Sequence, residues 1–228
     1  MIKLTQRLEA IKNRIKPDGR VIDVGTDHGM LPVYLIENGL ARHVTATDIS
    51  PDPLDKARRL AAEHGLTDKI DFVLTDGLVG VSPDADTVVI AGMGGETMIG
   101  ILAAAPWLRG RGVQLILQPQ SKQRELTVWL VENGYDIIGG SLVRERDKYY
   151  VIIEVSSIDP PRGMDEYYIL RLLCGTCDPI LPDYLDTLIK RQRYIVGGLE
   201  KSNAPDQLEI ERNRLAILES IKGETEKW

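Results

Sequence analysis

The sequence predicts a doubly wound α/β fold followed by a helical appendage. Three observations lead to this fold class. Short β-branched apolar runs alternate with helical patterns over the first part of the chain, two further strand-like runs are separated by only two residues, and the last part is helical in pattern. A chain of 228 residues is long enough for one large domain and such an appendage.

Five runs are typical of buried strands, because they are almost continuously apolar, as are strands covered on both faces by helices. They are R-V-I-D-V-G (20–25), H-V-T-A-T-D (43–48), K-I-D-F-V-L-T-D (69–76), T-V-V-I-A-G (87–92) and V-Q-L-I-L-Q (113–118). Helical patterns lie between them at Leu31–Asn38, Pro53–His64, Glu96–Ala104 and Lys122–Asn133. This alternation predicts a parallel sheet.

The next two runs predict an antiparallel hairpin. Y-D-I-I-G-G-S-L-V-R-E (135–145) and K-Y-Y-V-I-I-E-V-S-S (148–157) have only Arg146 and Asp147 between them, which leaves no room for a crossover helix. Parallel strands closed by an antiparallel pair form the Rossmann-like sheet of class I methyltransferases. A plain NAD-binding sheet more often ends on another parallel strand.

The stretch Asp159-Pro160-Pro161-Arg162-Gly163 breaks the pattern. We therefore expect an α/β domain over 1–158 and a helical domain over 163–228. Spacings of four and three predict a coiled-coil seam along Leu181, Leu185, Leu188, Gln192, Ile195 and Leu199. A turn at 202–206 and a weaker stripe of Leu208, Leu215 and Leu218 predict a second, antiparallel helix.

Composition indicates a cytoplasmic protein and leaves its partner open. No apolar run approaches the roughly 20 residues of a membrane span, and the start, M-I-K-L-T-Q-R-L-E-A-I, does not resemble a signal peptide. A formal net charge of −6 argues against a wholly positive surface, but a local basic face can still bind phosphates. We expect a monomer without an obligate protein partner.

The cysteines and histidines do not predict a metal site. Cys174 and Cys177 form a single C-G-T-C, and the three histidines lie far upstream, whereas a structural zinc site needs four ligands. A redox pair is an alternative, but no thioredoxin-like strand precedes the motif. We interpret the pair as two thiols in a reducing compartment.

The first strand is followed by a glycine turn, D-V-G-T-D-H-G, at 23–29. It fails the dinucleotide pattern G-x-G-x-x-G at the second glycine. Gly25 allows the backbone to approach a ligand closely, because no Cβ intrudes. Asp23, at the end of the strand, can face a cationic group such as the ammonium of a methionyl moiety.

Two more carboxylates end the next two strands. Asp48 is placed to accept hydrogen bonds from ribose hydroxyls, and Asp76 to meet an adenine amino group. Aspartate also begins turns for structural reasons alone, but three in order at the same edge of a sheet favour a ligand crevice. An acid on the second strand suits NAD as well, and the hairpin with the missing glycine favours S-adenosylmethionine.

Together with L-T-Q-R-L near the start, the motifs D-V-G-T-D-H-G-M-L-P, T-D-G-L, V-V-I-A-G-M-G-G, L-I-L-Q-P-Q and W-L-V-E-N-G-Y-D-I extend over most of the chain. In this combination the sequence resembles the bacterial tRNA (adenine(22)-N1)-methyltransferase family, TrmK, over essentially the whole chain, including the C-terminal helical hairpin. The resemblance implies S-adenosylmethionine as cofactor and N1 of an adenine in the tRNA D-loop region as methyl acceptor. Two departures are Asp52-Pro53 in place of a Gly-Pro pair, and a C-terminal hairpin that matches only in pattern.

Carried over to this sequence, the resemblance implies a set of residues lining the cofactor and its reacting end. They are Asp23, Gly25, Asp27, His28, Gly29, Asp48, Ile49, Asp76, Gly77, Gly92, Met93 and Gly94. A glycine-rich turn with no further role is the ordinary alternative for Gly95.

The chemistry needs no general base, because adenine N1 carries an unshared electron pair and no proton. The protein has to align the reactants and exclude water, and the base has to be unpaired and turned into the pocket. Asp27, Met93 and Gly94 are the candidate catalytic residues: Asp27 as a carboxylate near the cationic product, or else as an anchor of its loop. For His28 we favour cofactor contact or loop fixing over general-base catalysis.

The candidate phosphate contacts lie on the predicted first helix: Lys3, Arg7, Lys12, Arg14 and Lys16, of which the last four are the predicted tRNA contacts. The plain alternative is a solvated charged face. Three other functions stay open: methylation of another RNA site or a small molecule, a non-catalytic binding module on the same fold, and an NAD-dependent enzyme.

Overall fold

The computed structural model describes residues 2–157, 165–202 and 204–228. Its elements divide the chain into two compact units, Met1–Ile169 and Leu170–Trp228. The predicted chain break at 159–163 and Asn203 of the predicted turn lie outside the described residues. No helix of the described part is long and apolar enough to cross a membrane.

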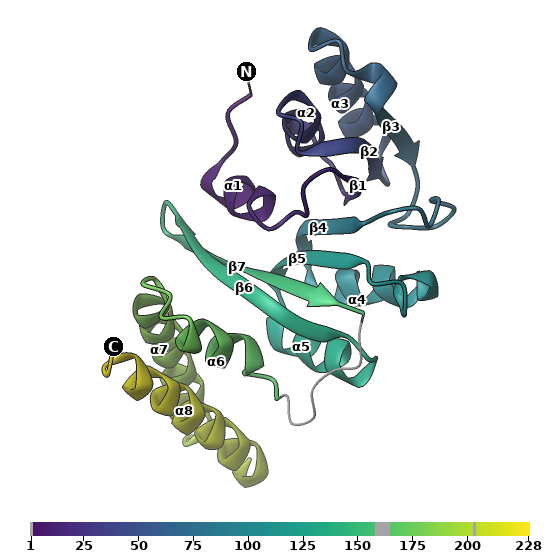
Figure 1. Cartoon of the computed structure of the whole chain (residues 1–228). Coiled ribbons are helices and arrows are strands. Elements are labelled where there is room, and N and C mark those ends of the chain that lie inside the picture. The colour runs from purple at the N-terminus through teal and green to yellow at the C-terminus, as the bar shows by residue number, and fades with distance from the viewer. Residues whose placement is uncertain (1, 158–164, 203) are drawn as a thin grey trace. The chain divides into compact units, whose positions relative to one another are not determined.

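The first unit is built on a seven-stranded sheet with the order β3-β2-β1-β4-β5-β7-β6 (Figure 1). The first five strands are parallel, and β7 is antiparallel to β5 and β6, so the predicted fold class is confirmed. The strands are β1 Gly19–Val24, β2 Ala41–Asp48, β3 Ile70–Leu74, β4 Thr87–Gly94, β5 Gln114–Ser121, β6 Asp136–Glu145 and β7 Lys148–Ser156.

Five α-helices and two short 3-10 turns accompany these strands. They are α1 Gln6–Lys12, α2 Met30–Glu37, α3 Pro51–Glu63, η1 Thr67–Lys69, α4 Gly95–Ala103, η2 Pro106–Leu108 and α5 Gln123–Glu132. Thr5 caps α1 by accepting a hydrogen bond from the amide of Leu8. Pro51 begins α3, where its missing amide hydrogen costs no helical bond.

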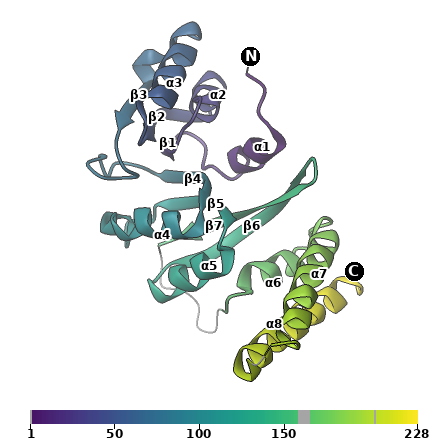
Figure 2. The same cartoon turned by 180° about the vertical axis from the view of Figure 1, so that it is seen from behind.

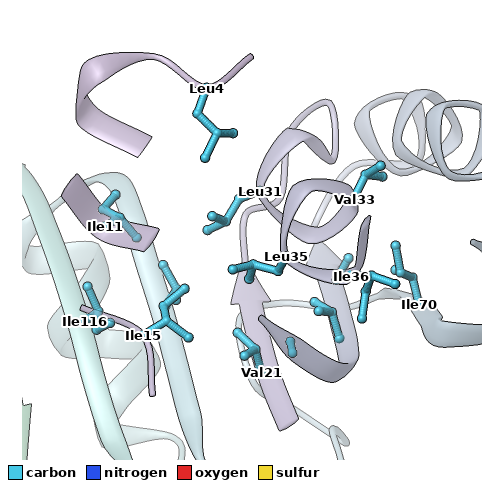
Figure 3. Packing of buried hydrophobic residues seen from close by; sticks show 14 of the residues in the cluster. Leu4, Ile11, Ile15, Val21, Leu31, Val33, Leu35, Ile36, Ile70 and Ile116 are labelled. Atoms are coloured by element: carbon cyan, nitrogen blue, oxygen red, sulfur yellow. The ribbon is translucent and has the colours of Figure 1, made fainter. Parts of the chain in front are cut away.

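Side chains alternate between the two faces of each strand, so the sheet has a helical layer on each side. On one face, α1, α2 and α3 pack against inward residues such as Val21, Val89 and Ile116 (Figure 3). Ile11 of α1 and Leu35 of α2 are both fully buried in that cluster. Helices α4 and α5 lie side by side, as seen from behind in Figure 2.

The first helix is shorter than the sequence suggests. It ends at Lys12, with Asn13 as C-cap, so Lys3 precedes the helix and Arg14 and Lys16 follow it. The prediction that all of these basic residues share one helix is therefore wrong. The chain turns after Asn13, and Ile15 is buried in the core between the sheet and helices α1 and α2.

The second unit is helical, with α6 Tyr168–Gly175 leading into it and α7 Leu181–Leu199 and α8 Pro205–Thr225 forming a hairpin. Contacts pair early residues of α7 with late residues of α8, which makes the two helices antiparallel. Lys222 bonds Asp186 at 2.8 Å, and Arg212 bonds Glu200 at 2.7 Å. Inside the hairpin the Gln192 amide donates to the Glu211 carboxylate at 2.6 Å.

The buried stripe of α7 differs from the predicted seam. It consists of Leu181, Tyr184, Leu185, Ile189, Gln192 and Val196, whereas Leu188, Ile195 and Leu199 are only half-buried. These buried positions follow the 3.6-residue period of a straight helix. A short hairpin does not need the 3.5-residue period that long supercoils maintain.

Gly95, the first residue of α4, is needed for packing. A Cβ there would lie 2.4 Å from the carbonyl oxygen of Lys122, so α4 can approach the start of α5 only with glycine. We expect Gly95→Ala to lower the free energy of unfolding by about 1–3 kcal/mol through overpacking. Gly100→Ala is the control, because a Cβ at Gly100 of the same helix meets nothing within 4 Å.

In urea denaturation, Gly100→Ala should raise stability by about 0.5–1 kcal/mol, the usual gain of alanine over glycine in a helix. Equal effects of the two substitutions would contradict the close approach at Gly95.

Candidate active site

A cavity of about 480 Å³ opens at the carboxyl ends of β1, β2, β3 and β4. The chain leaves β1 toward β2 on one side while β4 lies on the other, and ligands of open α/β sheets bind at such a reversal. The lining includes most of the residues predicted for the cofactor: Asp23, Gly25, Asp27, His28, Asp48, Ile49, Asp76, Gly77, Gly92 and Met93. Gly29 and Gly94 are not among its lining residues.

Asp23 presents a buried carboxyl group to this cavity from the end of β1. Burial raises its pKa to about 6, because the charged form loses its hydration. The nearby Thr26 side chain and the positive charge of Arg7 act in the opposite direction, and the nearby Asp48 carboxylate raises the pKa further. A positive group inside the cavity would therefore gain a strong partner in ionised Asp23.

Arg7 reaches the cavity from α1 and is held by residues of β5 and β6. Its guanidinium donates to the Gln118 side-chain oxygen at 2.8 Å, and its backbone amide donates to the Glu145 carboxylate at 3.2 Å. The guanidinium also lies 5.7 Å from the centre of the Tyr150 ring. These contacts fix the positive charge beside Asp23.

Asp48, at the end of β2, is oriented by backbone amides. The amide of Ser50 donates to one carboxylate oxygen at 2.9 Å, and the amide of Asp27 donates to the other at 3.4 Å. The turn after β1 is itself tied to β2, because the amides of Gly25 and Thr26 donate to the Thr47 carbonyl at 2.8 and 2.9 Å. The Asp48 carboxylate therefore has a fixed position at the cavity wall.

Asp27 and His28 form an exposed pair in the same turn. Asp27 has a φ of 53°, a left-handed conformation that aspartate adopts more readily than most residues. His28 Nδ1 lies 2.9 Å from an Asp27 carboxylate oxygen, and His28 Nε2 lies 3.4 Å from Lys56 Nζ. Both ring nitrogens thus have partners, which is the geometry of a loop-fixing histidine.

Asp76 and Gly77 follow β3 and close the cavity on that side. The Thr47 hydroxyl donates to the Gly77 carbonyl at 3.1 Å and holds this turn against β2. Gly77 has a φ of 61°, and a Cβ there would lie 2.8 Å from the Ile101 side chain. Asp76 itself is exposed at the rim.

The end of β4 departs from regular pairing. Ala91 pairs with Gln118 and Met93 with Pro119, so Gly92 is an extra residue on β4; next, Gly94 pairs with Ser121, so Gln120 is an extra residue on β5. Both unpaired residues line the cavity. Irregularities of this kind turn side chains toward active sites.

The glycines here make space for named neighbours. A Cβ on Gly25 would lie 2.2 Å from the Met93 methyl carbon, and a Cβ on Gly92 would lie 3.2 Å from the Arg7 guanidinium. Gly25 and Gly92 have φ values of 72° and 81°. Met93 therefore packs directly over the glycine turn of β1.

Of the basic residues predicted to contact tRNA, only Arg7 lines the cavity. Lys12 pairs with Glu9 at 2.9 Å. Arg14 pairs with Glu154 at 2.8 Å, and it also donates to Ser141 and to the Gly140 carbonyl. Lys16 is exposed.

Sequence reasoning missed part of the lining. The additional residues are Leu8, Val24, Thr26, Met30, Leu31, Thr47, Thr75, Ala91, Thr97, Ile101 and Gln120. Gln120 is the most polar of them, and its place two residues beyond the predicted fifth strand was a usable signal. No group of three metal-binding side chains occurs among the residues that the structure describes.

The cavity suits S-adenosylmethionine in three ways. A buried carboxyl group at Asp23 matches an ammonium, the amide-held Asp48 carboxylate matches ribose hydroxyls, and the turn at Gly25 lets the backbone lie close to the space because no Cβ intrudes. This sheet order with an antiparallel last pair, together with that site, defines a class I methyltransferase.

Comparison with known proteins gives the family. A family model described as "Methyltransferase domain" matches residues 4–153. The tRNA (adenine(22)-N(1))-methyltransferase of Bacillus subtilis is 32% identical over 166 residues, which cover 72% of this chain and 69% of the relative. The chain belongs to the tRNA (adenine(22)-N(1))-methyltransferase family.

Solved structures agree with the fold. The crystal structure of the B. subtilis enzyme TrmK superposes with a TM-score of 0.84 at 24% identity, covering 97% of this chain and 100% of that one. A putative tRNA (m1A22) methyltransferase of Streptococcus pneumoniae in complex with S-adenosyl-L-methionine gives 0.85 at 23% identity, covering 96% of this chain and 100% of that one.

The raised pKa of Asp23 predicts how cofactor affinity depends on pH. Binding an ammonium requires the ionised carboxylate, so below pH 6 a proton has to leave Asp23 first. We expect the dissociation constant for S-adenosylmethionine to rise about tenfold between pH 7 and pH 5, measured by calorimetry. Asp23→Asn should weaken binding at pH 7 and remove most of this dependence. A wild-type constant that stays flat over this range would contradict the assignment.

Proposed function

We infer that this protein transfers the methyl group of S-adenosylmethionine to N1 of adenine 22 in the D-loop region of tRNA. The observation that carries this inference is the relationship at 32% identity to a tRNA (adenine(22)-N(1))-methyltransferase. The methyltransferase-domain match over residues 4–153 includes the cavity-forming strands. The cavity supports this inference because it offers carboxylates for the cofactor. Its one histidine, His28, has partners at both ring nitrogens, which suits a reaction that needs no general base.

The residues that would hold the cofactor follow from the geometry. Asp23 would bind the ammonium, Asp48 the ribose hydroxyls, and Ile49 with Asp76 and Gly77 the adenine at the rim. Ile49 is 69% exposed, which is unusual for isoleucine and consistent with an apolar wall that a bound ring would cover. S-adenosylmethionine supplies a methyl group activated by the positive charge of its sulfur.

The acceptor needs orientation rather than activation. Adenine N1 attacks through its own electron pair, so no side chain has to remove a proton beforehand. We propose that Gly92 leaves space for the base at the end of β4 and that Met93 forms the wall beside the turn at Gly25, while Gly94 follows them outside the lining. The methylated base is cationic, and Asp27 is the exposed carboxylate proposed to stabilise it, with anchoring of the turn through His28 as its other role.

Arg7 fits a role inside the site better than a contact with distant phosphates. Its guanidinium is committed to Gln118 and lies beside Asp23 and Gly92. We propose that Arg7 positions the reacting end of the cavity. Gln120, which has no hydrogen-bond partner among the described residues, is available to the incoming base.

The protein is proposed to act in the cytoplasm and as a monomer. The cytoplasm is where its inferred substrate, tRNA, is found.

The proposed ribose contact predicts the effect of Asp48→Ala. Loss of a carboxylate that accepts two hydroxyl donors should raise the dissociation constant for S-adenosylmethionine about 10- to 100-fold. Asp52→Ala is the matched control, because Asp52 is exposed at the start of α3 and does not line the cavity. Unchanged affinity in Asp48→Ala would refute the ribose assignment.

The function itself is tested by methylation of unmodified tRNA transcripts, followed by mapping of the modified base. We expect one N1-methyladenosine at position 22 and none in a transcript with guanine at that position. A product at another base or on a small molecule would favour the wider class of methyltransferases. Absence of both methylation and cofactor binding would favour a non-catalytic module.

A further inference from the structure

A second hollow borders the cofactor cavity on the outer side of the glycine turn. It lies between the N-terminal segment and α3, has a volume of about 620 Å³, and is open to solvent. His28 and Met30 line both hollows, so they form the border between them. We call the second hollow the basic groove, after the residues Lys3, Lys56 and Arg59 that line it.

The cations of the basic groove lack protein counter-charges. Lys3, Lys56 and Arg59 are all exposed, and among the described residues none of them has a carboxylate within ion-pair distance. Arg59 Nε donates to the Asp55 backbone carbonyl at 3.3 Å, and Lys56 Nζ lies 3.4 Å from His28 Nε2. Glu63 is the single carboxylate in the described lining of the groove. In a chain with a formal net charge of −6, this is a local excess of positive charge.

Two of the basic residues predicted for the first helix differ in this respect. Lys12 is paired with Glu9, and Arg14 is held by Glu154, Ser141 and Gly140. A phosphate that approached Arg14 would have to displace a part-buried ion pair. In the described part of the chain, no ion pair has to be displaced for a phosphate to reach Lys3, Lys56 or Arg59.

The floor of the basic groove is apolar. Ile2, Met30 and Leu60 line it and are half-buried, so each presents part of its side chain to the hollow. An apolar floor between cations suits a nucleotide, which pairs an anionic phosphate with a sugar and a flat base.

We propose that the basic groove binds the RNA backbone next to the adenine that enters the cofactor cavity. The inference rests on the proposed function, and it adds where the substrate lies. A base that is turned into the cavity brings its neighbouring phosphates to the cavity rim. The basic groove begins at this rim, because His28 and Met30 line both hollows. Lys56 of the groove also contacts His28, in the turn that lines the cavity.

The test replaces Lys3, Lys56 and Arg59 by glutamine, which removes charge without adding repulsion. Lys69→Gln is the matched control, because Lys69 follows α3, is exposed and lines neither hollow. For each variant, tRNA binding is measured by fluorescence anisotropy at several salt concentrations, and S-adenosylmethionine binding by calorimetry. Both measurements are independent of turnover.

We expect the triple variant to bind tRNA at least about tenfold more weakly and to lose about two units of the slope of log K against log salt concentration, as for the loss of three phosphate contacts. Its affinity for S-adenosylmethionine should stay within about twofold of the wild-type value, and Lys69→Gln should match the wild type. Wild-type tRNA affinity and salt dependence in the triple variant would overturn the proposal. Failure of the wild-type protein to methylate tRNA would overturn the proposed function. The binding measurements would still show whether the basic groove binds RNA.

Discussion

The site depends on the attraction between the buried carboxyl group of Asp23 and the guanidinium of Arg7. Burial raises the pKa of Asp23 because its charged form loses hydration, and the positive charge of Arg7 offsets part of this rise. Arg7 is in turn fixed by Gln118 of β5 and Glu145 of β6. The attraction between Arg7 and Asp23 thus connects the N-terminal helix, strand β1 and the terminal hairpin, and it sets the polarity of the cavity where the cofactor's ammonium is expected.

Much of the fold could be predicted from the sequence because parallel strands buried on both faces have an unmistakable pattern. The run around Val21 and Val24 and the two-residue connection at Arg146 and Asp147 leave few other topologies. The carboxylates Asp23 and Asp48 could be placed for a related reason. Residues that end neighbouring parallel strands meet at one edge, so their order in the chain already implies a shared cavity.

Other features depend on tertiary contacts that no local pattern carries. Gln120 enters the cavity through irregular pairing of β4 with β5, which follows from the fit of the two strands. Helical spacing alone places the basic residues on one helix, but α1 ends at Lys12 and Arg14 pairs with the part-buried Glu154. Lys56 and Arg59, far away in the sequence, instead gather beside Lys3.

The central claim is that this site works by alignment and needs no general base. His28, the one histidine of the cavity, already bonds Asp27 and Lys56. The most direct test is the single-turnover rate of methyl transfer to tRNA, with enzyme and cofactor saturating, between pH 7 and pH 9. A base-free reaction predicts a rate that stays level across this range. A rate that rises about tenfold per pH unit would show that a proton must leave before transfer, and would contradict the account.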